Sequence, residues 1–120
     1  MNASMEIAKY SLEGVNLKDI QNLLVGGFAF EDFYKFTSKS DQVFVIFSDK
    51  YSTATESDLM VSVIIEFLNE KQCRVEIVTG GGGYGASRDD FSSERISMMK
   101  VTTWLEQACE MNHWYLKRVD

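Results

Sequence analysis

The chain contains no proline, only two cysteines and a single histidine. Average proline usage of about 5% would give about six prolines in a chain of 120 residues. Without proline no turn has a fixed φ angle, and no slow prolyl isomerisation is expected during folding. Cys73 and Cys109 are too few for a disulfide framework; we interpret both as buried small hydrophobic residues and leave a disulfide between them open. One histidine and two distant cysteines give no metal-ligand spacing, so no metal and no cofactor are predicted.

Basic charge and long apolar runs are also scarce. Twelve Lys and Arg residues stand against eighteen Asp and Glu residues, for a formal net charge of −6. Binding to nucleic acid phosphates or to an anionic membrane needs a clustered basic surplus, so neither partner is predicted. The longest apolar stretch, Leu59 to Leu68, is interrupted by Ser62 and Glu66 and is too short to span a bilayer. The start "MNASMEIAKY" does not resemble a signal peptide, which predicts a cytoplasmic protein.

A hydrophobic content of 45% in 120 residues is typical of one globular domain, and we assign residues 1–120 to it. Glu6–Leu12 alternates as a strand does, with its apolar residues on one face. A short helix follows, with Asn16 as its N-cap and Gly26-Gly27 as its C-cap. Residues 28–41 fit either a strand or a helix, because their phenylalanines match both spacings.

Three strands come next, in "QVFVIFS", "LMVSVIIEFL" and "CRVEIVT", and their short connections predict an antiparallel meander. In the second strand Leu59, Val61, Val63, Ile65 and Phe67 share one face. A long helix is predicted from about Ser92 to Asn112, with a buried stripe through Met98, Val101, Leu105, Ala108 and either Met111 or Asn112. The predicted fold is therefore α+β, a mainly antiparallel sheet of about four strands with two helices in the order β-α-β-β-β-α.

The predicted sheet has apolar residues on both faces. A half-solvated antiparallel sheet usually carries polar residues on its outer face. We place Phe44, Ile46, Met60 and Ile64 on a second face, opposite Val43, Val45, Phe47 and their partners. If the helices do not cover this second face, it is a candidate interface with another copy of the chain, a homodimer.

The stretch "VTGGGGYGASRDD" is the main candidate for a ligand site. Gly80-x-Gly82-x-x-Gly85 matches a dinucleotide fingerprint in letters, but no strand follows to supply an acid for the ribose. The phosphate-loop pattern lacks its lysine, because Ala86 occupies that position, and two aspartates follow. Two interpretations remain: a structural connection, or a backbone nest for a carboxylate or phosphate. The residues of the nest would be Gly80, Gly81, Gly82, Gly83, Tyr84, Gly85, Ser87 and Arg88.

No catalytic group is evident. His113 has no partner that the sequence can identify. Glu66 and Glu76 are more simply explained as exposed sheet acids facing Arg74 or Lys71 than as a coupled carboxylate pair. We therefore expect a non-catalytic binding or self-assembly domain, whose protein partner the sequence does not name. The alternative is a small-ligand or anion-binding protein that uses the loop 80–88.

The segments "SDKYS" and "VEIVTGGGGYG" ahead of a C-terminal helix resemble those of a small family of uncharacterised bacterial proteins, a domain of unknown function. The resemblance covers about two-thirds of the chain, from Gln42 onward, and the helix start "FSSERIS" departs from it. It implies a bacterial cytosolic protein and transfers no catalytic residue.

Overall fold

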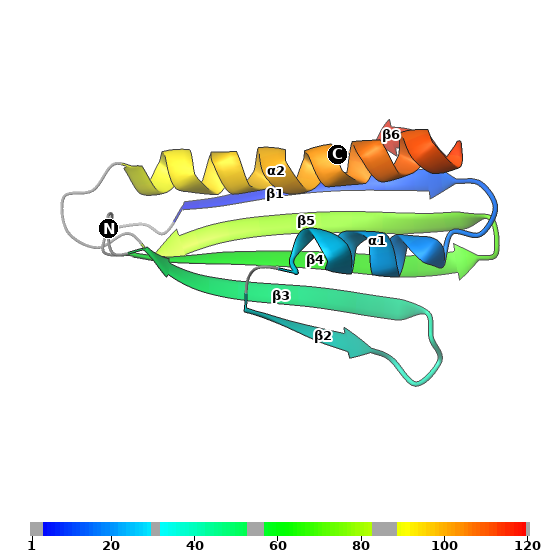
Figure 1. The fold of residues 1–120 in the computed structure, drawn as a ribbon, viewed down its shortest axis with the longest axis horizontal. Coiled ribbons are helices and arrows are strands. Elements are labelled where there is room, and N and C mark those ends of the chain that lie inside the picture. The colour runs from blue at the N-terminus through cyan, green and yellow to red at the C-terminus, as the bar shows by residue number, and fades with distance from the viewer. Residues whose placement is uncertain (1–3, 30–31, 53–56, 83–88, 120) are drawn as a thin grey trace.

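The computed structural model describes residues 4–29, 32–52, 57–82 and 89–119. Its elements in chain order are β1 (Ser4–Glu13), α1 (Asp19–Gly27), β2 (Phe33–Thr37), β3 (Val43–Ser52), β4 (Ser57–Asn69), β5 (Gln72–Gly82), α2 (Asp89–Asn112) and β6 (Tyr115–Arg118). The strands form one sheet in the order β2-β3-β4-β5-β1-β6, and every neighbouring pair is antiparallel. Both helices lie on the same face of this sheet (Figure 1).

The α+β class is correct, but the predicted strand count and order are wrong. Within the described residues the sheet has six strands rather than about four, and the chain order is β-α-β-β-β-β-α-β. One added strand, β2, lies in the segment that fitted two patterns. The other, β6, is a four-residue edge strand that includes Lys117 and Arg118 and pairs with β1. Charged residues are common on edge strands, which makes a short one hard to distinguish from a tail.

The predicted alternation along the strands is confirmed. Ala8, Tyr10 and Leu12 are buried under the helices, as are the odd-numbered residues of β4 from Val61 to Phe67 and of β5 from Cys73 to Ile77. These side chains join those of the helices in a single core cluster. The predicted antiparallel meander β3-β4-β5 is also present, although β3 continues to Ser52 through residues that were expected to form a loop.

Helix α2 supplies most of the cover of the sheet. Its predicted stripe is confirmed as far as Ala108, because Met98, Val101, Leu105 and Ala108 are all buried. The predicted last member is wrong, since Met111 is exposed and Asn112 is only half-buried. The helix begins at Asp89 rather than near Ser92. It ends where His113 adopts a positive φ of 59°, which turns the chain back so that β6 can pair with β1. The buried Trp114 then anchors this turn by donating from Nε1 to the carbonyl oxygen of Val15 at 2.6 Å.

Helix α1 is present, but both of its predicted caps are wrong. Asn16 has a positive φ of 58° and lies in a turn before the helix, where its carbonyl accepts from the N–H of Asp19. Lys18 occupies the N-cap position, without a side-chain cap. Gly26 and Gly27 belong to the helix itself, and Phe28 follows as the C-cap residue. The glycine at 27 is required for a different reason, which is the close approach of α2.

A methyl group at position 27 would lie 2.6 Å from Cε3 of Trp104, whereas at position 26 it would meet nothing within 4 Å. We therefore expect Gly27→Ala to lower the free energy of unfolding by about 1–3 kcal/mol through overpacking. Gly26→Ala is the matched control in the same helical turn, and we expect it to raise stability by up to about 1 kcal/mol. Urea denaturation of both variants measures the difference. Equal effects of the two substitutions would show that α1 does not pack against Trp104.

Candidate functional site

The face of the sheet opposite the helices is left uncovered by the described residues, and we call it the open face. It carries ten apolar side chains that are exposed or half-buried: Met5, Ile7, Tyr34, Phe36, Val43, Val45, Phe47, Met60, Ile64 and Val78. In a half-solvated antiparallel sheet this face is expected to be mainly polar. The apolar character of the open face is therefore not explained by packing within one chain.

Of the four predicted interface residues, Met60 and Ile64 lie on the open face. The assignment of Phe44 and Ile46 to the same face is wrong, because both are buried under the helices with exposures of 4% and 0%. The register explains the error: Ile46 pairs with Val63, so an even-numbered residue of β3 shares a face with odd-numbered residues of β4. A one-residue difference in register exchanges the two faces of a strand.

The apolar residues of the open face are in register across the sheet. One row runs through Tyr34, Phe47, Ser62, Val78 and Ile7 across five neighbouring strands. Strands about 4.8 Å apart give such a row a width of about 20 Å. A parallel row begins with Phe36, Val45 and Ile64, and a third includes Met60 and Met5 on either side of Gly80. The patch is therefore continuous rather than a set of isolated exposed residues.

Around β5 the charges of the open face occur as opposite neighbours, whereas the exposed Asp49 of β3 lies opposite Met60 in the register of β3 and β4. Lys9 and Glu76 form an ion pair at 3.6 Å, and Arg74 stands opposite Glu66 in the register of β4 and β5. Glu66 thus faces Arg74, as predicted, whereas the cation that pairs with Glu76 is Lys9 rather than Arg74 or Lys71. These charges surround a hollow of about 600 Å³, which Ile64 and Val119 also line. The open face is apolar over β2 and β3 and concave near β1.

The glycine segment is only partly described. Gly80, Gly81 and Gly82 are the last residues of β5 and pair with β4 on one side and, for Gly80 and Gly81, with β1 on the other. The structure therefore places three of the four consecutive glycines in a central strand of the sheet. Gly83, Tyr84, Gly85, Ser87 and Arg88 lie outside the described residues, so the proposed anion nest stays a prediction.

The phenylalanines of residues 28–41 and the single histidine do not gather at one site. Phe28 is buried and contacts Trp104 edge-on at 5.1 Å between centroids, as a core aromatic does, whereas Phe36 is exposed. His113 is exposed at the end of α2. No three His, Cys, Asp or Glu side chains gather closely enough to hold a metal ion within the part of the chain that the structure describes. Neither of the two described helices is both long and apolar enough to cross a membrane.

Cys73 and Cys109 are free and buried, which confirms their interpretation as core residues and leaves no disulfide between them. Burial raises the pKa of Cys73 to about 12, with a smaller contribution from Cys109. Burial also raises the pKa of Cys109 to about 11, with a smaller contribution from Glu106. The thiolate is the reactive form of cysteine. Because both thiols are buried and stay protonated near neutral pH, we expect both to react slowly.

We expect neither thiol to react with Ellman's reagent in the folded protein at about pH 8, because both are buried and protonated. Both should react after denaturation in guanidinium chloride, which provides the control for the count of thiols per chain. Rapid reaction of one thiol in the native protein would contradict the packing of α2 on β5.

The same pKa shifts make the free energy of unfolding depend on pH in the alkaline range. In the unfolded chain both thiols ionise near their ordinary pKa of 9.0, whereas in the folded protein they hold their protons until about 11 and 12. The unfolded state therefore binds fewer protons above pH 9, and the free energy of unfolding falls as the pH rises from there. We expect this fall to be smaller in a double variant with Cys73→Ala and Cys109→Ala. An identical slope in the wild-type and variant proteins, measured by urea denaturation, would contradict it.

Comparisons with known proteins add little to this geometry. No protein-family model matches the chain, and no curated protein matches it in sequence. The resemblance to a family of uncharacterised bacterial proteins therefore stays a prediction. Among solved structures, the chain is similar to the Zhui aromatase/cyclase from Streptomyces sp. R1128, with 10% sequence identity and a TM-score of 0.30 over 92% of this chain and 87% of that one. We draw no functional argument from a similarity of this size.

Proposed function

We propose that this protein is a self-assembling domain, and that two copies pack through their open faces. The observation that carries the proposal is a row across five strands, apolar at every position except Ser62, on a face that neither helix covers. Burial of apolar area is the main driving force of association, and stable sheet-on-sheet packing requires apolar residues on both inner faces.

A second copy of the chain fits this face better than an unrelated partner, because the face is complementary to itself. Its two most exposed aromatic residues, Tyr34 and Phe36, lie on the edge strand β2, and its hollow lies toward β1. A two-fold axis parallel to the strands places β2 of one copy over the β1 side of the other. Phe36 then faces the hollow, where Arg74 and the Lys9–Glu76 pair form a rim.

Electrostatics permits this arrangement despite the net charge of −6. The cations Lys9 and Arg74 each lie beside or opposite an acidic residue on the open face, so the part of the face around β5 and β1 carries little net charge. Two such faces repel each other less than two arbitrary acidic surfaces of this protein would.

Met60→Lys tests the proposal. Met60 is 44% exposed on the open face, so the variant should fold, but a lysine there would be desolvated in the dimer. We expect light scattering at micromolar concentration to give twice the chain mass of 13.7 kDa for the wild-type protein and the mass of one chain for the variant. The matched control is Met99→Lys, because Met99 is 62% exposed on α2 and should not affect assembly.

A wild-type mass of one chain at micromolar concentration would remove the proposal. If Met60→Lys and the wild-type protein instead both have the mass of two chains, the protein assembles through another surface.

A further inference from the structure

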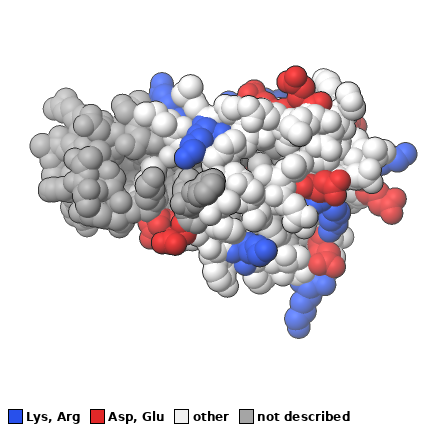
Figure 2. Space-filling model, viewed as in Figure 1, with Lys and Arg blue, Asp and Glu red and all other residues white. Residues whose placement is uncertain are grey.

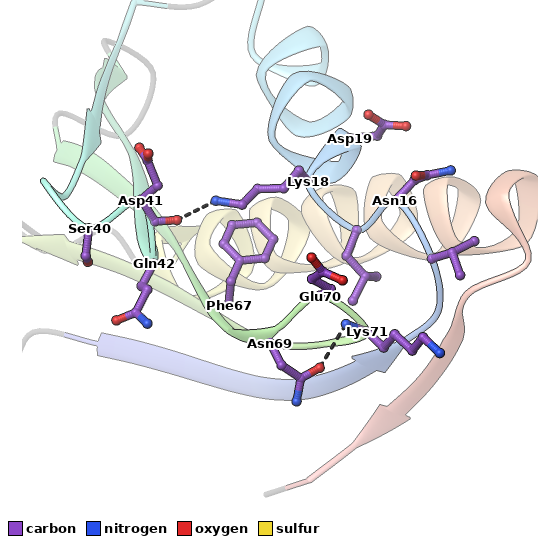
Figure 3. A pocket seen from close by; sticks show the side chains of 12 residues that line it. Asn16, Lys18, Asp19, Ser40, Asp41, Gln42, Phe67, Asn69, Glu70 and Lys71 are labelled. Atoms are coloured by element: carbon purple, nitrogen blue, oxygen red, sulfur yellow. Dashed lines mark hydrogen bonds between the residues drawn. The ribbon is translucent and has the colours of Figure 1, made fainter.

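A second concave site lies at the end of the sheet that carries the β4–β5 turn, away from the open face. It is a cleft of about 720 Å³, within the range of volumes of small-molecule sites. Three segments that are distant in sequence form it: the loop from Val15 to Asp19 before α1, the residues Ser40–Gln42 between β2 and β3, and the end of β4 with the following turn (Figure 3). We call it the turn cleft.

The walls of the turn cleft are joined by hydrogen bonds between these segments. The N–H of Phe67 donates to the carbonyl of Gln42 at 2.7 Å, and the N–H of Gly14 donates to the carbonyl of Lys71 at 3.0 Å. Within the β4–β5 turn, the N–H of Lys71 donates to Oδ1 of Asn69 at 2.8 Å. A cleft whose walls are connected in this way is already formed before a ligand binds, so little conformational entropy is lost on binding.

One cation in the turn cleft is held in a defined position. The Lys18 ammonium donates to the carbonyl oxygen of Asp41 at 2.5 Å and lies 4.3 Å from the centroid of the Phe67 ring. It forms no ion pair with a carboxylate of the described residues. An ammonium that is fixed by a neutral carbonyl and a ring retains its charge and further donors for an anionic group.

The opposite charge is also present. Glu70 lines the same cleft and forms no ion pair with the described cations. Figure 3 draws its carboxylate and the Lys18 ammonium on either side of the Phe67 ring. Charges of both signs also mix at this end of the molecule in Figure 2. With Asp19, Asp41 and Glu70 against Lys18 and Lys71, the acidic residues of the cleft outnumber the basic ones, which disfavours a purely anionic ligand such as phosphate.

From these observations we propose that the turn cleft binds a small zwitterion, an amino acid or a short peptide. The carboxylate of the ligand pairs with Lys18, its ammonium pairs with Glu70, and its carbon skeleton spans the cleft between these two side chains. The two protein charges face one cavity without pairing with each other, and a zwitterion satisfies both at once. The site is separate from the open face, so the inference does not depend on self-assembly.

A titration followed by two-dimensional ¹H–¹⁵N NMR tests this inference, because it reports both affinity and location. The probes are glycine, β-alanine, γ-aminobutyrate and glycylglycine, whose charges are separated by increasing distances. Acetate and ethylamine carry one charge each and serve as controls. We expect at least one zwitterion to saturate with a dissociation constant of about 1 mM and to bind at least about tenfold more tightly than either control. The shifted amides should include those of Gln42, Phe67 and Glu70.

Substitutions of Lys18 and Glu70 test whether both side chains bind the zwitterion. Lys18→Gln and Glu70→Gln should each weaken the best zwitterion by about tenfold or more. Lys39→Gln, in the turn before β3 but outside the cleft, is the matched control for the loss of a cation and should leave the affinity within about twofold. Lys18→Arg keeps the charge and should recover part of the binding.

Three outcomes would overturn the inference. The first is the absence of saturation by every zwitterion in a wild-type protein whose spectrum shows a folded chain. The second is equal binding of a zwitterion and a singly charged control. The third is a set of shifts confined to Gly80–Gly82, which would place the site at the glycine segment instead.

Discussion

The fold depends on one constraint: its strands have apolar residues on both faces, but its two helices cover only one. Along β4, Val61, Val63 and Ile65 are buried beneath α1 and α2, while Met60 and Ile64 point to the other side. The helical face is completed by close contacts, such as that of Gly27 with Trp104. The open face has no equivalent cover among the described residues. An apolar sheet face of this width in contact with water is unfavourable, so its presence calls for a partner surface.

The elements that could be predicted from the sequence are those whose apolar pattern is long and regular. The stripe of α2 and the alternation of β1, β4 and β5 were predicted correctly, since burial selects the residue type at each position. The edge strand β2 was left open between strand and helix because its phenylalanines fitted both spacings, and the edge strand β6 was missed because it is short and charged. The pairing of both depends on residues elsewhere in the chain. The αL conformation of His113, which directs the chain into β6, leaves no sequence signal comparable with a glycine.

The site was predicted less well than the fold, for a related reason. The existence of a second apolar face followed from apolar residues at both alternating sets of positions along the strands, but the residues that form this face depended on the register between β3 and β4. This register placed Phe44 and Ile46 in the core and left Val45 and Phe47 on the open face. The turn cleft had no sequence signal, because Lys18, Asp41 and Glu70 meet only after three separate turns come together. Hydrogen bonds between residues distant in sequence, such as that from the N–H of Phe67 to the carbonyl of Gln42, position these side chains. No local sequence pattern encodes such bonds.

The central claim is that the open face is covered in solution, and the methionines of the chain can report on it directly. Met5 and Met60 lie on the open face, Met99 and Met111 lie on the outer side of α2, and Met98 is buried as an internal reference. Hydroxyl-radical footprinting with mass spectrometry measures the oxidation rate of each thioether. Our account predicts that Met60 and Met5 are oxidised more slowly than Met99 and Met111 at high protein concentration, and that dilution removes this protection. Oxidation of Met60 at the rate of Met99 at every concentration would contradict it.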